Sequence, residues 1–143
     1  NYKVMSQSPQ ILPMLAVSAV IVNDKGQVLL IKRNKEPDRN TWQLIAGGVN
    51  GGERLVEAIQ RYVKEKVGIT KINTIEFTGK YYDDPKRHSS SFCIPFVFKV
   101  CVDADVAIQT DRDYQWFSKK ELRDLPIALD NKQTLIDLQL CDA

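Results

Sequence analysis

The chain has 143 residues, of which 43% are hydrophobic and 27% are charged, so it is long enough to bury one core and leaves little room for a second. Its formal net charge of +2 and its pI near 8.4 lack the strong, clustered basic excess of a dedicated nucleic-acid binder. We therefore expect one domain, residues 1–143, with no nucleic acid among its partners.

The apolar segments and the cysteines favour a cytoplasmic protein. The longest apolar stretch, residues 11–22, is interrupted by Pro13 and Ser18 and is too short to span a bilayer. No charged leader precedes it, so we expect neither a signal peptide nor a membrane partner. Because the first residue is Asn1, we expect that some natural N-terminal sequence is missing. The three cysteines cannot all pair with one another, which is typical of a reducing compartment.

The first part of the chain predicts a β-hairpin, a loop and a glycine-rich segment. Apolar residues 14–22 and 27–32 flank the turn residues 23–26, which is the pattern of a hairpin. Residues 34–40 are polar and contain a proline, so we expect a loop there. Residues 47–52 contain four of the seven glycines and predict a flexible loop that leads into a helix.

The next segment predicts a helix over residues 53–67 that ends at Gly68. Apolar residues at helical spacing form a stripe that we expect to face a core: Leu55, Val56, Ile59, Val63 and Val67. Tyr62 extends this stripe, and a place in the core is the preferred interpretation over a catalytic role. Lys66 falls inside the same arc, which suits a charge only if the arc opens on a cleft.

The rest of the chain alternates strands with short helices. We expect strands over residues 71–82, 91–102 and 113–117, a capping box at residues 118–121 that opens a short helix, and a last helix over residues 130–140. Thr78-Gly79 marks a possible bulge, and Pro95 indicates an edge position or a bulge. This order predicts an α/β (α+β) fold in which a mixed β-sheet is sandwiched between α-helices.

The segment around the first helix carries a long motif with fixed spacing. Gly47, Glu53, Arg61, Val63, Glu65, Gly68 and Ile69 fall without a gap on G-x5-E-x7-R-E-U-x-E-E-x-G-U, where U is aliphatic, and Trp42 stands upstream. The chain therefore resembles the Nudix (MutT-like) hydrolase superfamily, which implies the Nudix fold. Asp84-Pro85 and residues 125–130 also resemble the ADP-ribose pyrophosphatase and Nudix-related regulator subgroup.

Four departures from the family pattern affect the expected metal site. Tyr62 and Lys66 replace two of its three box glutamates, Ile45-Ala46 replaces Pro-Gly, and Asn50 stands at an often acidic position. Positions 62, 65 and 66 share one arc of a helix. Three carboxylates there would suit a hard cation, but one carboxylate with a phenol and an ammonium would not. The box is therefore degenerate.

The resemblance also implies roles for individual residues. Glu65, helped by Glu53 and the Gly47 carbonyl, would hold Mg²⁺ or Mn²⁺ if the protein is active, and otherwise no cofactor is expected. The catalytic residues would be Glu65, Glu53 and a base from a late loop, with Asp111 or Asp113 as candidates. Glu53 and Arg61 would form a structural ion pair, and Gly68 would end the helix.

Arg33, Trp42, Tyr82 and Arg87 are the residues that we expect to bind substrate. Trp42, Tyr81 and Tyr82 could stack on a base, although single aromatic residues near strands more often belong to the core. Residues 86–88 could bind phosphate, although a solvated loop is the more frequent explanation.

Two functional interpretations follow. In the preferred one, the domain recognises a nucleoside diphosphate linked to another moiety and has weak or lost pyrophosphohydrolase activity. In the alternative, it is an active Mg²⁺-dependent hydrolase of nucleoside diphosphate derivatives such as ADP-ribose, or of a nucleoside triphosphate. Related regulators carry an added winged-helix domain, which 143 residues cannot hold, so a sensor would need a separate output domain. A nucleotide-type ligand is expected in either case, and a homodimer is possible.

Overall fold

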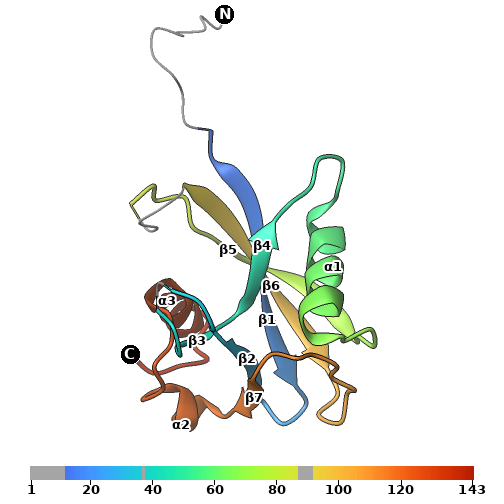
Figure 1. Cartoon of the computed structure of the whole chain (residues 1–143), viewed down its shortest axis with the longest axis vertical. Coiled ribbons are helices and arrows are strands. Elements are labelled where there is room, and N and C mark those ends of the chain that lie inside the picture. Colours follow the sequence, from blue (N-terminus) through green and yellow to red (C-terminus); the bar gives the residue numbers. More distant parts are fainter. Residues whose placement is uncertain (1–11, 37, 87–91) are drawn as a thin grey trace, which may run out of the picture.

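A mixed β-sheet lies between helix α1 on one side and helices α2 and α3 on the other (Figure 1). The computed structural model describes residues 12–36, 38–86 and 92–143. Within these ranges the strands are β1 (Met14–Asn23), β2 (Val28–Lys32), β3 (Trp42–Gln43), β4 (Ile45–Gly48), β5 (Thr74–Tyr81), β6 (Cys93–Val102) and β7 (Tyr114–Phe117). The helices are α1 (Leu55–Val67), α2 (Lys119–Leu122) and α3 (Leu129–Asp137). The expected sheet between helices is confirmed.

Strand β1 is the centre of the sheet. It pairs in parallel with β6 over its whole length and antiparallel with β2 and β4 at its two ends, in the order β3-β2-β1-β6-β5. The pairing with β4 sets Val17 opposite Gly47 and Ala16 opposite Gly48. Because β1 is buried over most of its length, it fixes β4, and therefore the start of the segment leading to α1, against the core.

Alternate residues of β1 divide the core into two clusters, because successive side chains of a strand point to opposite faces. Val17, Ala19 and Ile21 pack with the inner face of α1, whereas Val20 and Val22 pack with α2 and α3. On α1 the buried positions are Ala58, Ile59, Val63 and Val67. The expected stripe is therefore confirmed at its centre, but Val56 is 40% exposed and lies outside it.

Two expected features near α1 need correction. Gly47 and Gly48 are not part of a flexible loop, because both belong to β4 and pair with β1. Helix α1 begins at Leu55 rather than at Glu53. The physical reason is that Glu53 closes the preceding turn, with its amide donating to the Asn50 carbonyl at 3.0 Å. The Glu57 carboxylate then accepts from the Arg54 amide at 2.8 Å and closes the first turn of the helix.

Pro95 lies in an internal strand, so the expectation of an edge position is wrong. β6 pairs with β1 on one side and with β5 on the other. The register of β5 shifts between Phe77 and Tyr81, which confirms the bulge expected at Thr78-Gly79. The Pro95 carbonyl accepts from the Tyr82 amide at 3.3 Å, just beyond the end of β5. The missing N–H of Pro95 is tolerated there because the ladder with β5 has already ended.

The other expected elements are present in the expected order, although the last helix, expected over residues 130–140, ends at Asp137. The first two strands form the hairpin, and the capping box at Ser118 opens α2, with Glu121 donating its amide to Ser118 Oγ at 3.2 Å. No helix in the described part of the chain is long and apolar enough to cross a membrane. Cys101 and Cys141 carry free thiols.

Gly68 ends α1 in the left-handed region, with φ of 66°, and a Cβ on it would overlap the backbone of Gln109. Gly26 has a similar φ of 76°, but nothing lies within 4 Å of its Cβ position. Both alanine variants should lose about 1–2 kcal/mol from backbone strain. Gly68→Ala should lose at least about 1 kcal/mol more, because the clash adds to the strain. Urea denaturation of both variants measures the difference, and equal losses would contradict the close approach of Gln109.

Candidate functional site

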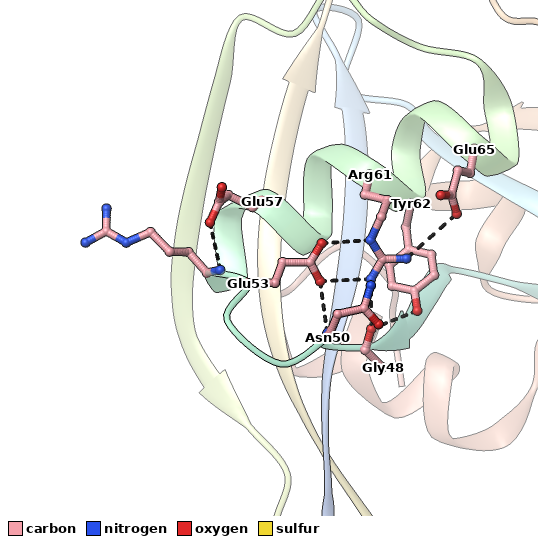
Figure 2. A network of polar contacts seen from close by, with 8 residues as sticks. Gly48, Asn50, Glu53, Glu57, Arg61, Tyr62 and Glu65 are labelled. Atoms are coloured by element: carbon pink, nitrogen blue, oxygen red, sulfur yellow. Dashed lines mark hydrogen bonds and ion pairs between the residues drawn. The ribbon is translucent and has the colours of Figure 1, made fainter.

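An ion pair fastens the segment between β4 and α1 to the helix (Figure 2). Arg61 Nε donates to Glu53 Oε2 at 2.7 Å, and Arg61 Nη2 donates to Glu53 Oε1 at 2.9 Å. The same Nη2 donates to the Gly48 carbonyl at 3.2 Å, and the Asn50 amide donates to Glu53 Oε1 at 3.0 Å. The hydrogen bonds that Glu53 accepts from Arg61, and then the one from the Asn50 amide, lower the pKa of Glu53 from 4.5 to about 2. The expected structural ion pair is therefore present in a two-pronged form.

Tyr62 fills the space beside Gly47. Its ring lies so close that a Cβ on Gly47 would overlap it, which explains why a glycine stands there. The phenol Oη donates to the Gly48 carbonyl at 2.7 Å (Figure 2). Arg61 Cζ lies 4.3 Å from the centroid of the ring, and Lys66 Nζ lies 5.4 Å from it. Tyr62 is thus half-buried against the core cluster beneath α1, but its polar end serves to bind β4.

Lys66 turns its ammonium towards β4 and the cleft beside it. Nζ donates to the Ala46 carbonyl at 2.9 Å, and the side chain lines a cavity. Burial, followed by the charge of Arg112, lowers the pKa of Lys66, while the Glu65 carboxylate opposes this shift. The arc of α1 that carries Lys66 therefore does open on a cleft.

The cavity beside Lys66 has a volume of about 280 Å³ and lies between β1, β4, β6 and α3, near the lower end of the range for small-molecule sites. Polar side chains contribute to its walls: Ser18, Arg33, Gln43, Lys66, Asp130, Asn131 and Thr134. Arg33 Nη1 donates to Gln43 Oε1 at 3.4 Å, and Asn131 Oδ1 accepts from the Leu44 amide at 2.7 Å. The bond from Leu44 to Asn131 joins α3 to the strands around the cavity.

The acidic side chains of the motif do not form a cradle for a metal ion. Both oxygens of Glu53 already accept from Arg61, and Glu65 Oε2 lies 3.8 Å from the other end of the same guanidinium. The Glu65 side chain is 58% exposed. Within residues 12–36, 38–86 and 92–143, no group of three or more His, Cys, Asp or Glu side chains is placed to hold a metal ion. A cation thus already lies between the two expected ligands.

Side chains also occupy the backbone positions near the motif. The Tyr62 ring covers Gly47, the Tyr62 hydroxyl binds the Gly48 carbonyl, and the Lys66 ammonium binds the Ala46 carbonyl. Mg²⁺ and Mn²⁺ need several oxygen ligands in near-octahedral geometry. The residues present therefore do not fit the metal that the sequence pattern implies.

The two aromatic residues expected to bind substrate, Trp42 and Tyr82, are half-buried. Trp42 packs edge-on against Phe117 with ring centroids 4.9 Å apart, and Lys32 Nζ lies 5.6 Å from its centroid. Tyr82 donates its hydroxyl to Asp137 Oδ2 at 2.6 Å. Both contact the core cluster beneath α2 and α3, as the core interpretation expected. Arg33 lines the cavity, whereas Arg87 lies outside the described residues.

The late loop before β7 brings a basic residue that sequence reasoning missed. Asp111 and Asp113, the expected base candidates, line a hollow of about 120 Å³ together with Arg33 and Arg112. Arg112 Nη2 donates to the Lys32 carbonyl at 3.0 Å, but its Nε is buried without a hydrogen-bond partner. Nothing in the spacing of the sequence singles out Arg112, because its position follows from the pairing of β7 with β2.

The profile of the NUDIX domain matches residues 12–138 of the chain. The chain belongs to the Nudix family. In this Nudix domain, two positions at which the family pattern has glutamate carry hydrogen-bond donors, Tyr62 and Lys66. Both donors bind the backbone of β4, so the departures from the pattern form one connected arrangement.

Curated Nudix relatives include the 8-oxo-dGDP phosphatase NUDT18 of Mus musculus, 47% identical over 53 residues, which are 37% of this chain and 16% of that protein. The NAD-capped RNA hydrolase NudC of Pseudomonas aeruginosa is 27% identical over 128 residues, which are 90% of this chain and 45% of that protein. The chain thus spans less than half the length of these relatives. The solved Nudix domain of Shewanella oneidensis NrtR, complexed with ADP ribose, matches with a TM-score of 0.76 at 22% identity, covering 97% of this chain and 92% of that one.

The Glu53–Arg61 ion pair should make stability depend on pH. The pKa of Glu53 in the folded protein, about 2, is below the ordinary 4.5, so its contribution is complete above the ordinary value and is lost as pH falls towards 2. Glu53→Gln should therefore be less stable than the unmodified protein at neutral pH, and the difference should shrink from about pH 5 to about pH 2.

Urea denaturation at a series of pH values measures this difference. Glu76→Gln, an exposed change on β5, is the control and should show no comparable loss at neutral pH. A deficit in Glu53→Gln that stays constant down to about pH 2 would show that the carboxylate charge does not stabilise the segment.

Proposed function

We propose that this Nudix domain recognises a nucleoside diphosphate linked to another moiety and that it hydrolyses the diphosphate weakly or not at all. The family membership supports the class of ligand. The relatives' names add to it, because NAD-capped RNA and ADP-ribose both contain a nucleoside diphosphate joined to a second group. Those ligands belong to the NudC relative and to the NrtR domain, and their chemistry suits a cavity with polar walls.

The observation that carries the weak-hydrolysis half of the proposal is the contact between α1 and β4. Where a hydrolytic metal would need oxygen ligands, Tyr62 and Lys66 present an O–H and an ammonium, and each binds a carbonyl of β4. A metal offsets the charge that develops when water attacks phosphorus and lowers the pKa of that water. Without such a group, Glu65 alone supplies neither effect.

A second candidate, a Mg²⁺-dependent hydrolase, is favoured by two features. The Glu65 side chain is 58% exposed, and Asp111 and Asp113 line a hollow that also contains Arg33. An ion held by Glu65 and a base from this loop would satisfy the minimum for metal-assisted attack of water. This would require Lys66 to leave the Ala46 carbonyl, because its charge would repel the ion.

The proposal is tested by comparing the unmodified domain with a repaired box, Tyr62→Glu with Lys66→Glu. ADP-ribose, NAD and nucleoside triphosphates are incubated with Mg²⁺ or Mn²⁺, and release of the cleaved nucleotide is measured. The unmodified domain should turn over far below the ordinary range of about 1–10³ s⁻¹. The repaired box places two more carboxylates beside Glu65 on one helical arc, so it should hydrolyse at least about tenfold faster, which corresponds to about 1.4 kcal/mol of barrier.

The control is Lys64→Glu, which adds a carboxylate to the same helix at an exposed position outside the arc and should leave the rate of hydrolysis unchanged.

The repaired box should also bind Mg²⁺ more tightly and be less stable without it, because three clustered carboxylates repel one another. Ordinary turnover by the unmodified domain would overturn the proposal and establish the hydrolase. A repaired box that gains metal without cleavage would place the defect elsewhere, in the Ile45-Ala46 segment or in the absence of a base.

A further inference from the structure

Two half-buried cations near the cavity lack a partner of opposite charge. Within residues 12–36, 38–86 and 92–143, neither Lys66 nor Arg112 forms an ion pair with a carboxylate. Their polar contacts are to backbone carbonyls: Lys66 Nζ binds that of Ala46, and Arg112 Nη2 binds that of Lys32. Taking charges out of water without a counter-charge is unfavourable. The arrangement therefore favours an anion supplied from outside the chain.

The donors of these two side chains are also incompletely used. An ammonium has three N–H groups, and Lys66 uses one of them, towards Ala46. Arg112 Nε is buried and has no hydrogen-bond partner within the described part of the chain. A buried N–H without an acceptor is costly, so the Arg112 guanidinium is incompletely satisfied.

Arg33 lies between the two spaces that Lys66 and Arg112 line. Lys66 and Arg33 line the cavity of about 280 Å³, and Arg33 and Arg112 line the adjoining hollow of about 120 Å³. One side chain therefore borders both spaces.

We propose that Lys66 and Arg112 form a built-in cationic site that holds the diphosphate of the ligand without a divalent metal. The inference rests on the proposed function, because it assigns the part of the cavity that takes the diphosphate. Lys66 offers a compact point charge and Arg112 a planar donor group, and both suit phosphate oxygens. Carboxylates also line both spaces, Asp130 the cavity and Asp111 and Asp113 the hollow, so a bound diphosphate would contact the two cations and avoid these side chains.

This arrangement separates binding from hydrolysis. Fixed N–H donors neutralise the charge of a bound diphosphate in its ground state, which contributes to affinity. An ammonium and a guanidinium carry no water ligand, so they do not deliver a metal-activated nucleophile. The same substitution that removes a carboxylate from the box, Lys66, thus adds a ligand-binding group at that position.

The test is isothermal titration with two probes, inorganic pyrophosphate and ADP-ribose, each in EDTA and in Mg²⁺ at the same ionic strength. The unmodified domain should bind both probes in EDTA, with a dissociation constant within about twofold of that in Mg²⁺. Lys66→Gln and Arg112→Gln keep an N–H donor for the backbone carbonyls but remove the charge. Each should weaken binding of both probes at least about tenfold, or about 1.4 kcal/mol.

The matched control is Lys64→Gln, which removes the same charge from an exposed position of α1 and should leave both dissociation constants unchanged. Lys66→Arg keeps the charge and should keep most of the affinity, so it decides the question if Lys66→Gln does not fold in a thermal melt. Binding that requires Mg²⁺, or Lys66 and Arg112 variants that bind as tightly as Lys64→Gln, would overturn the inference. If ADP-ribose still binds in those cases, the proposed function stands and only the built-in site falls; if neither probe binds the folded domain, both fall.

Discussion

Helix α1 is fastened to strand β4 by side-chain donors that all bind backbone carbonyls of one short strand. Arg61 and Tyr62 bind the Gly48 carbonyl, and Lys66 binds that of Ala46. Since β4 is itself paired with the buried central strand β1, this contact sets the position of the helix relative to the cavity. The Glu53–Arg61 ion pair also holds the segment that connects β4 to α1 against the helix.

This contact relates the stability of the helix to the proposed loss of hydrolysis. Family-pattern carboxylates on the arc of α1 would repel one another unless a cation neutralised them. Tyr62 and Lys66 remove that requirement, because each has a donor that finds a neutral acceptor on β4. The helix is thereby held without a metal ion, and of positions 62, 65 and 66 on the arc only Glu65 carries a carboxylate. What remains is a polar cavity with cations at its wall, which suits recognition of an anion.

Much of the fold could be predicted from local sequence patterns. Alternation and turn chemistry predicted the hairpin, helical spacing with Gly68 predicted α1 and its end, and Ser118 predicted the capping box of α2. The pattern failed where pairing partners decide the structure. Gly47 and Gly48 form a strand only because β1 lies beside them, and Pro95 is tolerated inside the sheet only because β5 ends opposite it.

The site was predictable to a smaller extent. The fixed spacing of the motif predicted the Glu53–Arg61 pair and identified Tyr62 and Lys66 as the departures that matter. It could not predict that these two side chains bind β4, because that depends on how closely the helix approaches the strand. The position of Arg112 could not be predicted for a similar reason, because its contact with Lys32 joins residues far apart in sequence.

A structure of crystals grown with Mn²⁺ and ADP-ribose would test whether the chain supplies its own cation where the family pattern implies a metal. Anomalous scattering locates any manganese without reference to the atomic model. We expect no manganese beside Glu65, with Lys66 Nζ still bound to the Ala46 carbonyl and within about 2.7–2.9 Å of a phosphate oxygen. A manganese ion coordinated by Glu65, with Lys66 turned away from Ala46, would contradict this expectation.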